Sequence, residues 1–149
     1  MNVMDLLKEN GRDIVVDAAE ALRRARLPHY ELAAPAEAHG RLQTLCDLTL
    51  ECLRANTTAP MSRYAQKIAS ERFFSGYTLR EVQTAFNLLE ESIWNQILDK
   101  MQIEEFAAAV TAVNAPLRAG KDEIAQTYFS LLTRSKASSS DLKAHFNGF

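Results

Sequence analysis

Apolar residues recur every three or four positions along most of this chain, the spacing that places them on one face of an α-helix. The pattern divides into segments at residues 4–27, 35–54, 60–75 and 79–100, with a last long segment from residue 103. No alternating strand pattern or hairpin signal interrupts them. The sequence therefore predicts an all-α protein, a bundle of five helices. The expected inward-facing positions of the first, second and fourth segments are Leu7, Gly11, Ile14, Ala18, Leu22, Ala25, Leu42, Leu45, Cys46, Thr49, Leu53, Leu79, Val82, Phe86, Leu89, Ile93 and Ile97.

The boundary between the third and fourth segments carries the clearest local signals. Gly76 suits the left-handed residue that ends a helix. Thr78 and Glu81 match a capping box, in which an N-cap hydroxyl and an acidic side chain three residues later satisfy each other's backbone N–H groups. We therefore expect one helix to end before Gly76 and the next to begin at Leu79.

The last long segment contains Pro116, yet its apolar stripe stays in phase on both sides of that proline. The stripe consists of Phe106, Val110, Val113, Leu117, Ile124, Tyr128 and Leu131. Two separate helices would have no reason to stay in register, so one long C-terminal helix kinked near Pro116 is favoured over a break there. Residues 1–135 are expected to form the helical domain, and the serine-rich residues 136–149 a flexible tail or linker.

Composition narrows the function classes. Apolar residues make up 47% and charged residues 24% of 149 residues, as in an ordinary globular domain. The net charge of −2 makes nucleic acid a poor partner. No apolar run approaches the roughly 20 residues that a membrane span needs, and Asp5 and Glu9 interrupt the apolar region of any export signal.

The two cysteines also bear on the compartment. Cys46 and Cys52 are six residues apart on one expected helix, a separation of about 9 Å that a disulfide cannot span. We expect free, buried thiols and a reducing, cytoplasmic location, with a redox-sensing pair as the alternative.

Candidate chemistry is sparse. His29, His39 and His145 have no partner at metal-ligand spacing, so no metal or cofactor is expected. No nucleophile–base pair is evident either. Two alternatives remain: a haem or tetrapyrrole-binding globin-like sensor, and a histidine phosphotransfer protein in which Arg41 supplies a cation beside His39. The Glu90–Glu91 pair and Arg72 are interpreted as solvated surface charge.

Aromatic residues are frequent in the third to fifth segments. Core packing is the ordinary role for most of them. Part of the set is predicted to line a small-molecule pocket or a dimer surface, and the candidates are Phe86, Trp94, Tyr128 and Phe129.

The order of these signals resembles the N-terminal domain family of RsbT co-antagonists, the RsbRD-type sensor modules. The matching stretches are Leu27-Pro28-His29-Tyr30, the leucine-rich residues 42–53, and Gly76-Tyr77-Thr78-Leu79-Arg80-Glu81-Val82 followed by Phe86, Leu88 and Leu89. The resemblance covers about residues 5–135.

The resemblance implies a non-enzymatic signal-input domain of a stressosome-type protein, globin-like in shape without haem. It also implies a homodimer that passes its signal to a regulatory partner or to a downstream output domain. The family has no catalytic residue set to carry over to this chain.

Overall fold

The structure is a computed structural model that describes the backbone of residues 1–147 and the side chains of residues 1–135. Within that range the chain is all-helical and contains no strand, which confirms the predicted class. Six α-helices and one short 3₁₀ helix follow one another: α1 (Val3–Arg24), α2 (Pro28–Leu32), α3 (Pro35–Ala55), α4 (Ala59–Phe74), α5 (Leu79–Lys100), η1 (Ile103–Glu105) and α6 (Phe106–Asn147).

The predicted number of five helices was wrong by one, because residues 28–34 were expected to be a simple connection. Leu27 is extended, at φ −77° and ψ 129°, as favoured for a residue that precedes proline. Pro28 then occupies the first turn of α2, a position that needs no N–H donor. α1 ends at Arg24, three residues before the expected end at Leu27, and Arg26 turns the chain with φ 51°.

The α4–α5 junction is built as expected. Gly76 has φ 88°; its N–H donates to the carbonyl of Phe73, and the N–H of Tyr77 donates to the carbonyl of Arg72. These two bonds form a Schellman motif, which satisfies the last carbonyls of α4. The Thr78 hydroxyl accepts the N–H of Glu81 at 3.1 Å, and the Glu81 carboxylate accepts the N–H of Thr78 at 3.0 Å. The capping box is confirmed, and α5 has the predicted bounds.

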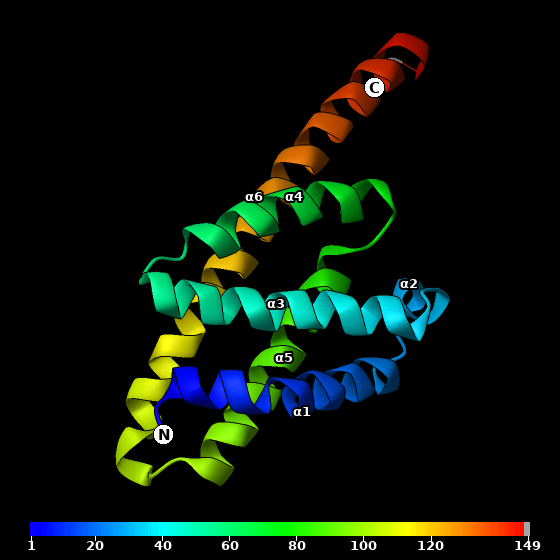
Figure 1. Cartoon of the computed structure of the whole chain (residues 1–149). Helices are drawn as coiled ribbons and strands as arrows, with labels where there is room; N and C mark the ends of the chain where they lie inside the picture. The colour runs from blue at the N-terminus through cyan, green and yellow to red at the C-terminus, as the bar shows by residue number, and fades with distance from the viewer. Residues whose placement is uncertain (148–149) are drawn as a thin grey trace.

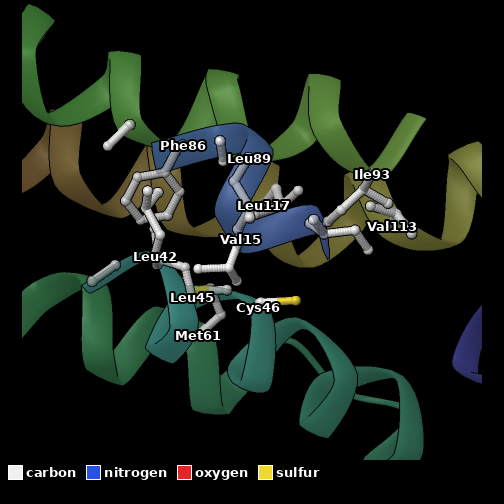
Figure 2. Close-up of a cluster of buried hydrophobic side chains, with 14 of the residues drawn as sticks. Val15, Leu42, Leu45, Cys46, Met61, Phe86, Leu89, Ile93, Val113 and Leu117 are labelled. Atoms are coloured by element: carbon white, nitrogen blue, oxygen red, sulfur yellow. The ribbon is translucent and has the colours of Figure 1, made fainter. Parts of the chain in front are cut away.

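The helices bury one continuous core. α1 packs on α3 and α5, and α6 packs on α4 and α5, as Figure 1 shows. Figure 2 shows part of this core, to which α1, α3, α4, α5 and α6 all contribute side chains; the labelled residues are Val15, Leu42, Leu45, Cys46, Met61, Phe86, Leu89, Ile93, Val113 and Leu117. Ser92 donates a 2.8 Å hydrogen bond to the carbonyl of Ile14 and so ties α5 to α1 inside this core.

α6 is a single helix that contains Pro116 in its interior. Its fully buried positions extend to Tyr128, whereas Phe129 and residues 132–135 are exposed. The C-terminal part of α6 therefore projects beyond the other helices (Figure 1). The helical backbone continues into the predicted tail as far as Asn147, and residues 148–149 lie outside the described part. The division into a domain and a linker stays a prediction.

Candidate functional site

The four aromatic residues predicted to form a ligand or dimer surface do not lie together on one face. Phe86 is 1% exposed and Tyr128 is 2% exposed, so both belong to the hydrophobic core. Trp94 is half-buried, and its indole N–H donates to Asn114 Oδ1 of α6 at 3.0 Å. Phe129 is 73% exposed. Helix packing turns the stripes of Phe86 and Tyr128 inward, so these two residues do not form an exposed surface. The assignment of the four residues to a ligand pocket or dimer surface stays a prediction.

A groove of about 780 Å³ lies between α1, α2 and the start of α3. Its volume falls within the range of about 300–1,000 Å³ that is usual for small-molecule sites. Its walls are partly apolar, from Val16, Ala19, Leu22 and Pro35, and partly charged. The charged residues along it are Asp17, Glu20, Arg23, Arg26 and Glu31. The sequence did not predict this groove, because α2, which contributes Tyr30 and Glu31 to its wall, was expected to be a simple connection.

A second, much smaller cavity of about 20 Å³ lies deeper in the bundle, lined by Arg41, Arg72, Tyr64 and core residues that include Phe86. The groove and this cavity share Leu22, Tyr30 and Ala38 as wall residues. Tyr30 therefore stands between them.

The ring of Tyr77, in the α4–α5 loop, is the centre of a polar and aromatic cluster. The ring of His29 lies 4.9 Å and that of Tyr30 5.3 Å from it, measured between ring centroids. Arg41 of α3 donates to the Tyr77 hydroxyl at 2.9 Å. The Tyr128 hydroxyl of α6 donates to the Tyr77 carbonyl, also at 2.9 Å. One loop residue thus connects α2 and α3 with α6.

The two arginines of the cluster lie against the same ring. The guanidinium carbons of Arg41 and Arg72 are 5.5 Å and 5.8 Å from the Tyr77 ring centroid, within cation–π range. The side chain of Arg72 is only 12% exposed, so interpreting it as surface charge was wrong. The sequence spacing could have shown that Arg72 lies on the buried face of α4, because Arg72 continues the series Met61, Ala65 and Ile68 at helical spacing.

Glu81 anchors α2 to the start of α5. Its carboxylate accepts the backbone N–H of His29 at 3.0 Å and faces His29 Nδ1 at 2.8 Å, while also capping α5. Burial by itself raises the pKa of Glu81, but the hydrogen bonds from Thr78 and His29 outweigh burial and lower it. The carboxylate is therefore ionised at neutral pH and buried, and its hydrogen bonds hold α2 against the start of α5.

The remaining candidates from the sequence occupy separate places. His39 lines the groove, and the side chain of His145 lies outside the described residues. Glu90, interpreted as solvated, is mostly buried and lies 3.5 Å from Lys121 Nζ of α6. Cys46 and Cys52 are buried free thiols, and burial raises the pKa of Cys46 to about 12. Within residues 1–135, no group of three histidine, cysteine, aspartate or glutamate side chains is placed to hold a metal ion.

Comparison with known proteins adds no relative: no protein-family model, curated protein or solved structure matches this chain. None of the helices in the described part has the length and apolarity to cross a membrane.

Proposed function

We propose that this chain is a non-enzymatic signal-input domain of the kind that its resemblance to RsbT co-antagonist N-terminal domains implies. It acts in the cytoplasm as a homodimer and has no cofactor. A ligand in the groove between α1, α2 and α3 favours one packing of the helices, and α6 passes that change to a regulatory partner or an output domain. This is a population shift between two packings of one fold.

The observation that carries the proposal is the position of Tyr77. Its ring packs against His29 and Tyr30, beside the groove, and its carbonyl accepts the hydroxyl of Tyr128 on α6. Movement of α2 is therefore transmitted to α6 through a single rigid aromatic residue. The Schellman motif and the capping box keep the short loop around Tyr77 in one conformation. The ring and the carbonyl of Tyr77 therefore move together.

The output side of the proposal concerns α6. Pro116 lacks the N–H that would bond to the carbonyl of Ala112, so the helix is weakest there. We take α6 to be kinked near Pro116 in a globin-like bundle, with the long helices forming the dimer seam. A change in that kink alters the direction of the projecting part of α6.

A mutation can stand in for the unknown ligand. Tyr30→Ala removes the ring between the groove and Tyr77, whereas Leu32→Ala changes a residue of the same helix that is 87% exposed. Trp94 is the only tryptophan of the chain and bonds to Asn114 of α6, so its fluorescence reports on α5–α6 packing. We expect Tyr30→Ala to shift the emission of Trp94 and Leu32→Ala to leave it unchanged.

The proposed relay runs from α2 through Tyr77 to α6, and Tyr128→Phe should weaken its second step, from Tyr77 to α6. The substitution removes only the hydroxyl that bonds to the Tyr77 carbonyl, so the effect of Tyr30→Ala on Trp94 should shrink in the double variant. Identical spectra for wild type and Tyr30→Ala, in folded protein, would rule out the relay.

A further inference from the structure

The small cavity behind Tyr30 has an unusual charge environment for a protein interior. Arg41 and Arg72 line it, their side chains 21% and 12% exposed, and none of its lining residues is acidic. A cation removed from water is normally matched by a carboxylate of similar burial. Here the partners Glu37 and Glu71 are about half exposed and lie outside the cavity wall. Among the described side chains, two arginines and no carboxylate therefore line the cavity.

Several residues that line the cavity carry hydrogen-bonding groups without a partner in the described part of the protein. Within residues 1–135 Arg72 makes no hydrogen bond through its side chain, and its ionic contact is with Glu71, 3.6 Å away. The hydroxyls of Tyr77 and Tyr128 are engaged, whereas those of Tyr30 and Tyr64, two further wall residues, have no protein partner in that range. A guanidinium group and two phenols are thus free to donate to an anion.

The two arginines affect the pKa values of both phenols. Burial raises the pKa of Tyr30 to about 12, and the nearby Arg72 and Arg41 oppose that rise. Burial also raises the pKa of Tyr64, against the same two arginines. Both phenols therefore stay protonated at neutral pH and remain donors.

The volumes limit the size of the ligand. A cavity of about 20 Å³ exceeds the 10–15 Å³ that one water requires but admits only the head group of an organic molecule. The rest of such a molecule would lie in the groove of about 780 Å³ that shares Tyr30, Leu22 and Ala38 with the cavity. Apolar walls from Val16, Ala19 and Pro35 suit a short hydrocarbon body there.

The charges along the groove restrict the ligand further. Three acidic residues, Asp17, Glu20 and Glu31, line it against two arginines. Glu20 lies 2.5 Å from Arg23, and the groove has one more carboxylate than arginine along it. A second negative charge on the part of the ligand that lies in the groove would gain little there and would face these carboxylates.

We propose that the cavity behind Tyr30 binds the carboxylate of a small monocarboxylic acid, held by Arg41 and Arg72 and by the hydroxyls of Tyr30 and Tyr64, with its apolar body in the groove. Arginine suits this role because its planar fork of N–H groups matches the two oxygens of a carboxylate. The inference names the ligand class of the proposed input site and rests on that proposal for its biological role.

Isothermal titration calorimetry at constant ionic strength tests the site with three probes. Hexanoate has the charge and the body, hexanamide has the same body without the charge, and inorganic phosphate has the charge without the body. We expect saturable binding of hexanoate at millimolar concentration or below. Hexanamide should bind at least about tenfold more weakly because it loses the charge-assisted hydrogen bonds. Phosphate should also bind at least about tenfold more weakly because it has no hydrocarbon body to bury in the groove. Equal binding of hexanamide, equal binding of phosphate, or no saturable hexanoate binding would each overturn the inference.

Variants on one helix locate the site. Arg72→Gln should weaken hexanoate binding on the order of tenfold to a hundredfold, whereas Arg63→Gln, an exposed arginine of the same helix α4, should not change it. Tyr64→Phe deletes one hydroxyl and should weaken binding about two- to tenfold; it serves if Arg72→Gln does not fold. Equal effects of Arg72→Gln and Arg63→Gln, or an unchanged affinity in a folded Tyr64→Phe protein, would place the anion elsewhere and contradict the inference.

Different results would contradict the carboxylate site and the relay through Tyr77. Hexanoate binding that depends on Arg72 but leaves Trp94 emission unchanged would support the carboxylate site and contradict the signal relay. Absence of hexanoate binding, with a Trp94 response to Tyr30→Ala, would support the relay and contradict the carboxylate site.

Discussion

Gly120 shows how a single residue controls the packing of three helices. An added Cβ at this position of α6 would lie 2.7 Å from Cε2 of Phe86 on α5 and 3.1 Å from Cγ of Met61 on α4. Real Cβ contacts are not that short, so the phenyl ring would have to move. At Gly40 of α3 an added Cβ has no neighbouring atom within 4 Å. These two helical glycines form a matched pair.

We expect Gly120→Ala to destabilise the protein and Gly40→Ala to stabilise it. Alanine in place of a helical glycine contributes up to about 1 kcal/mol of helix propensity at both sites. At Gly120 overpacking costs about 1–3 kcal/mol, which outweighs that gain. Urea denaturation monitored by circular dichroism measures both changes; stabilisation by Gly120→Ala would contradict the close approach of α6 to Phe86.

Glu81 provides a prediction about pH. Its lowered pKa means that the stability supplied by the ionised carboxylate is fully present above the pKa of an unfolded glutamate, about 4.3. That stability is lost as the pH falls from there through the lowered pKa of the folded state. At pH 7, Glu81→Gln should cost about 1–3 kcal/mol, because charge-assisted bonds to His29 and Thr78 are weakened.

The difference in unfolding free energy between wild type and Glu81→Gln should therefore shrink on acidification below about pH 4. Urea titrations at several pH values measure it. Glu91→Gln, at an exposed position of the same helix, is the control and should have little effect. A difference that stayed constant from pH 7 to acid would show that the charge of Glu81 does not stabilise the fold.

At the scale of the element, the start of α5 depends on a local cap. The Thr78 hydroxyl accepts the N–H of Glu81, and replacing such an N-cap with alanine costs about 0.5–2 kcal/mol. Thr84, one and a half turns into the same helix, bonds through its hydroxyl to the carbonyl of Arg80, which a helix does not need. We expect Thr78→Ala to lower the thermal midpoint and Thr84→Ala to leave it unchanged or raise it, in calorimetry.

The same scale shows what local patterns predict well. The bounds of α5 agreed with the sequence because a left-handed glycine, an N-cap and a capping glutamate all act within a few residues. The five residues of α2 were missed because they are too few for any periodicity to appear. That short helix forms one wall of the groove, so missing it also meant missing the groove.

At the scale of the whole molecule, the proposed dimer is tested by its mass. Phe129 and Leu132 are exposed and three residues apart on the projecting part of α6, so they share one face of the helix. If the long helices form the dimer seam, light scattering after size-exclusion chromatography should give twice the mass of one chain. Phe129→Glu should reduce that mass towards the monomer, because it buries a charge in the seam.

Leu32→Glu is the control for this experiment. Leu32 is an exposed leucine of the short helix α2, outside the long helices, and its change to glutamate should leave the mass unaltered. A wild-type protein that elutes as a monomer at all concentrations would remove the dimer from the proposed function.

The sequence alone determined the helical class, most of the helix boundaries and most of the core, because periodicity and caps act over a few residues of chain. It also placed Phe86 and Tyr128 on the stripes that the structure buries. It did not determine which stripes meet, or what lies between them. Tyr30, Arg41, Arg72 and Tyr77 belong to four different parts of the chain and carry no shared motif. Only the packing of α2, α3 and α4 around the α4–α5 loop brings them together, because a contact between distant residues depends on the arrangement of whole helices and not on their local pattern.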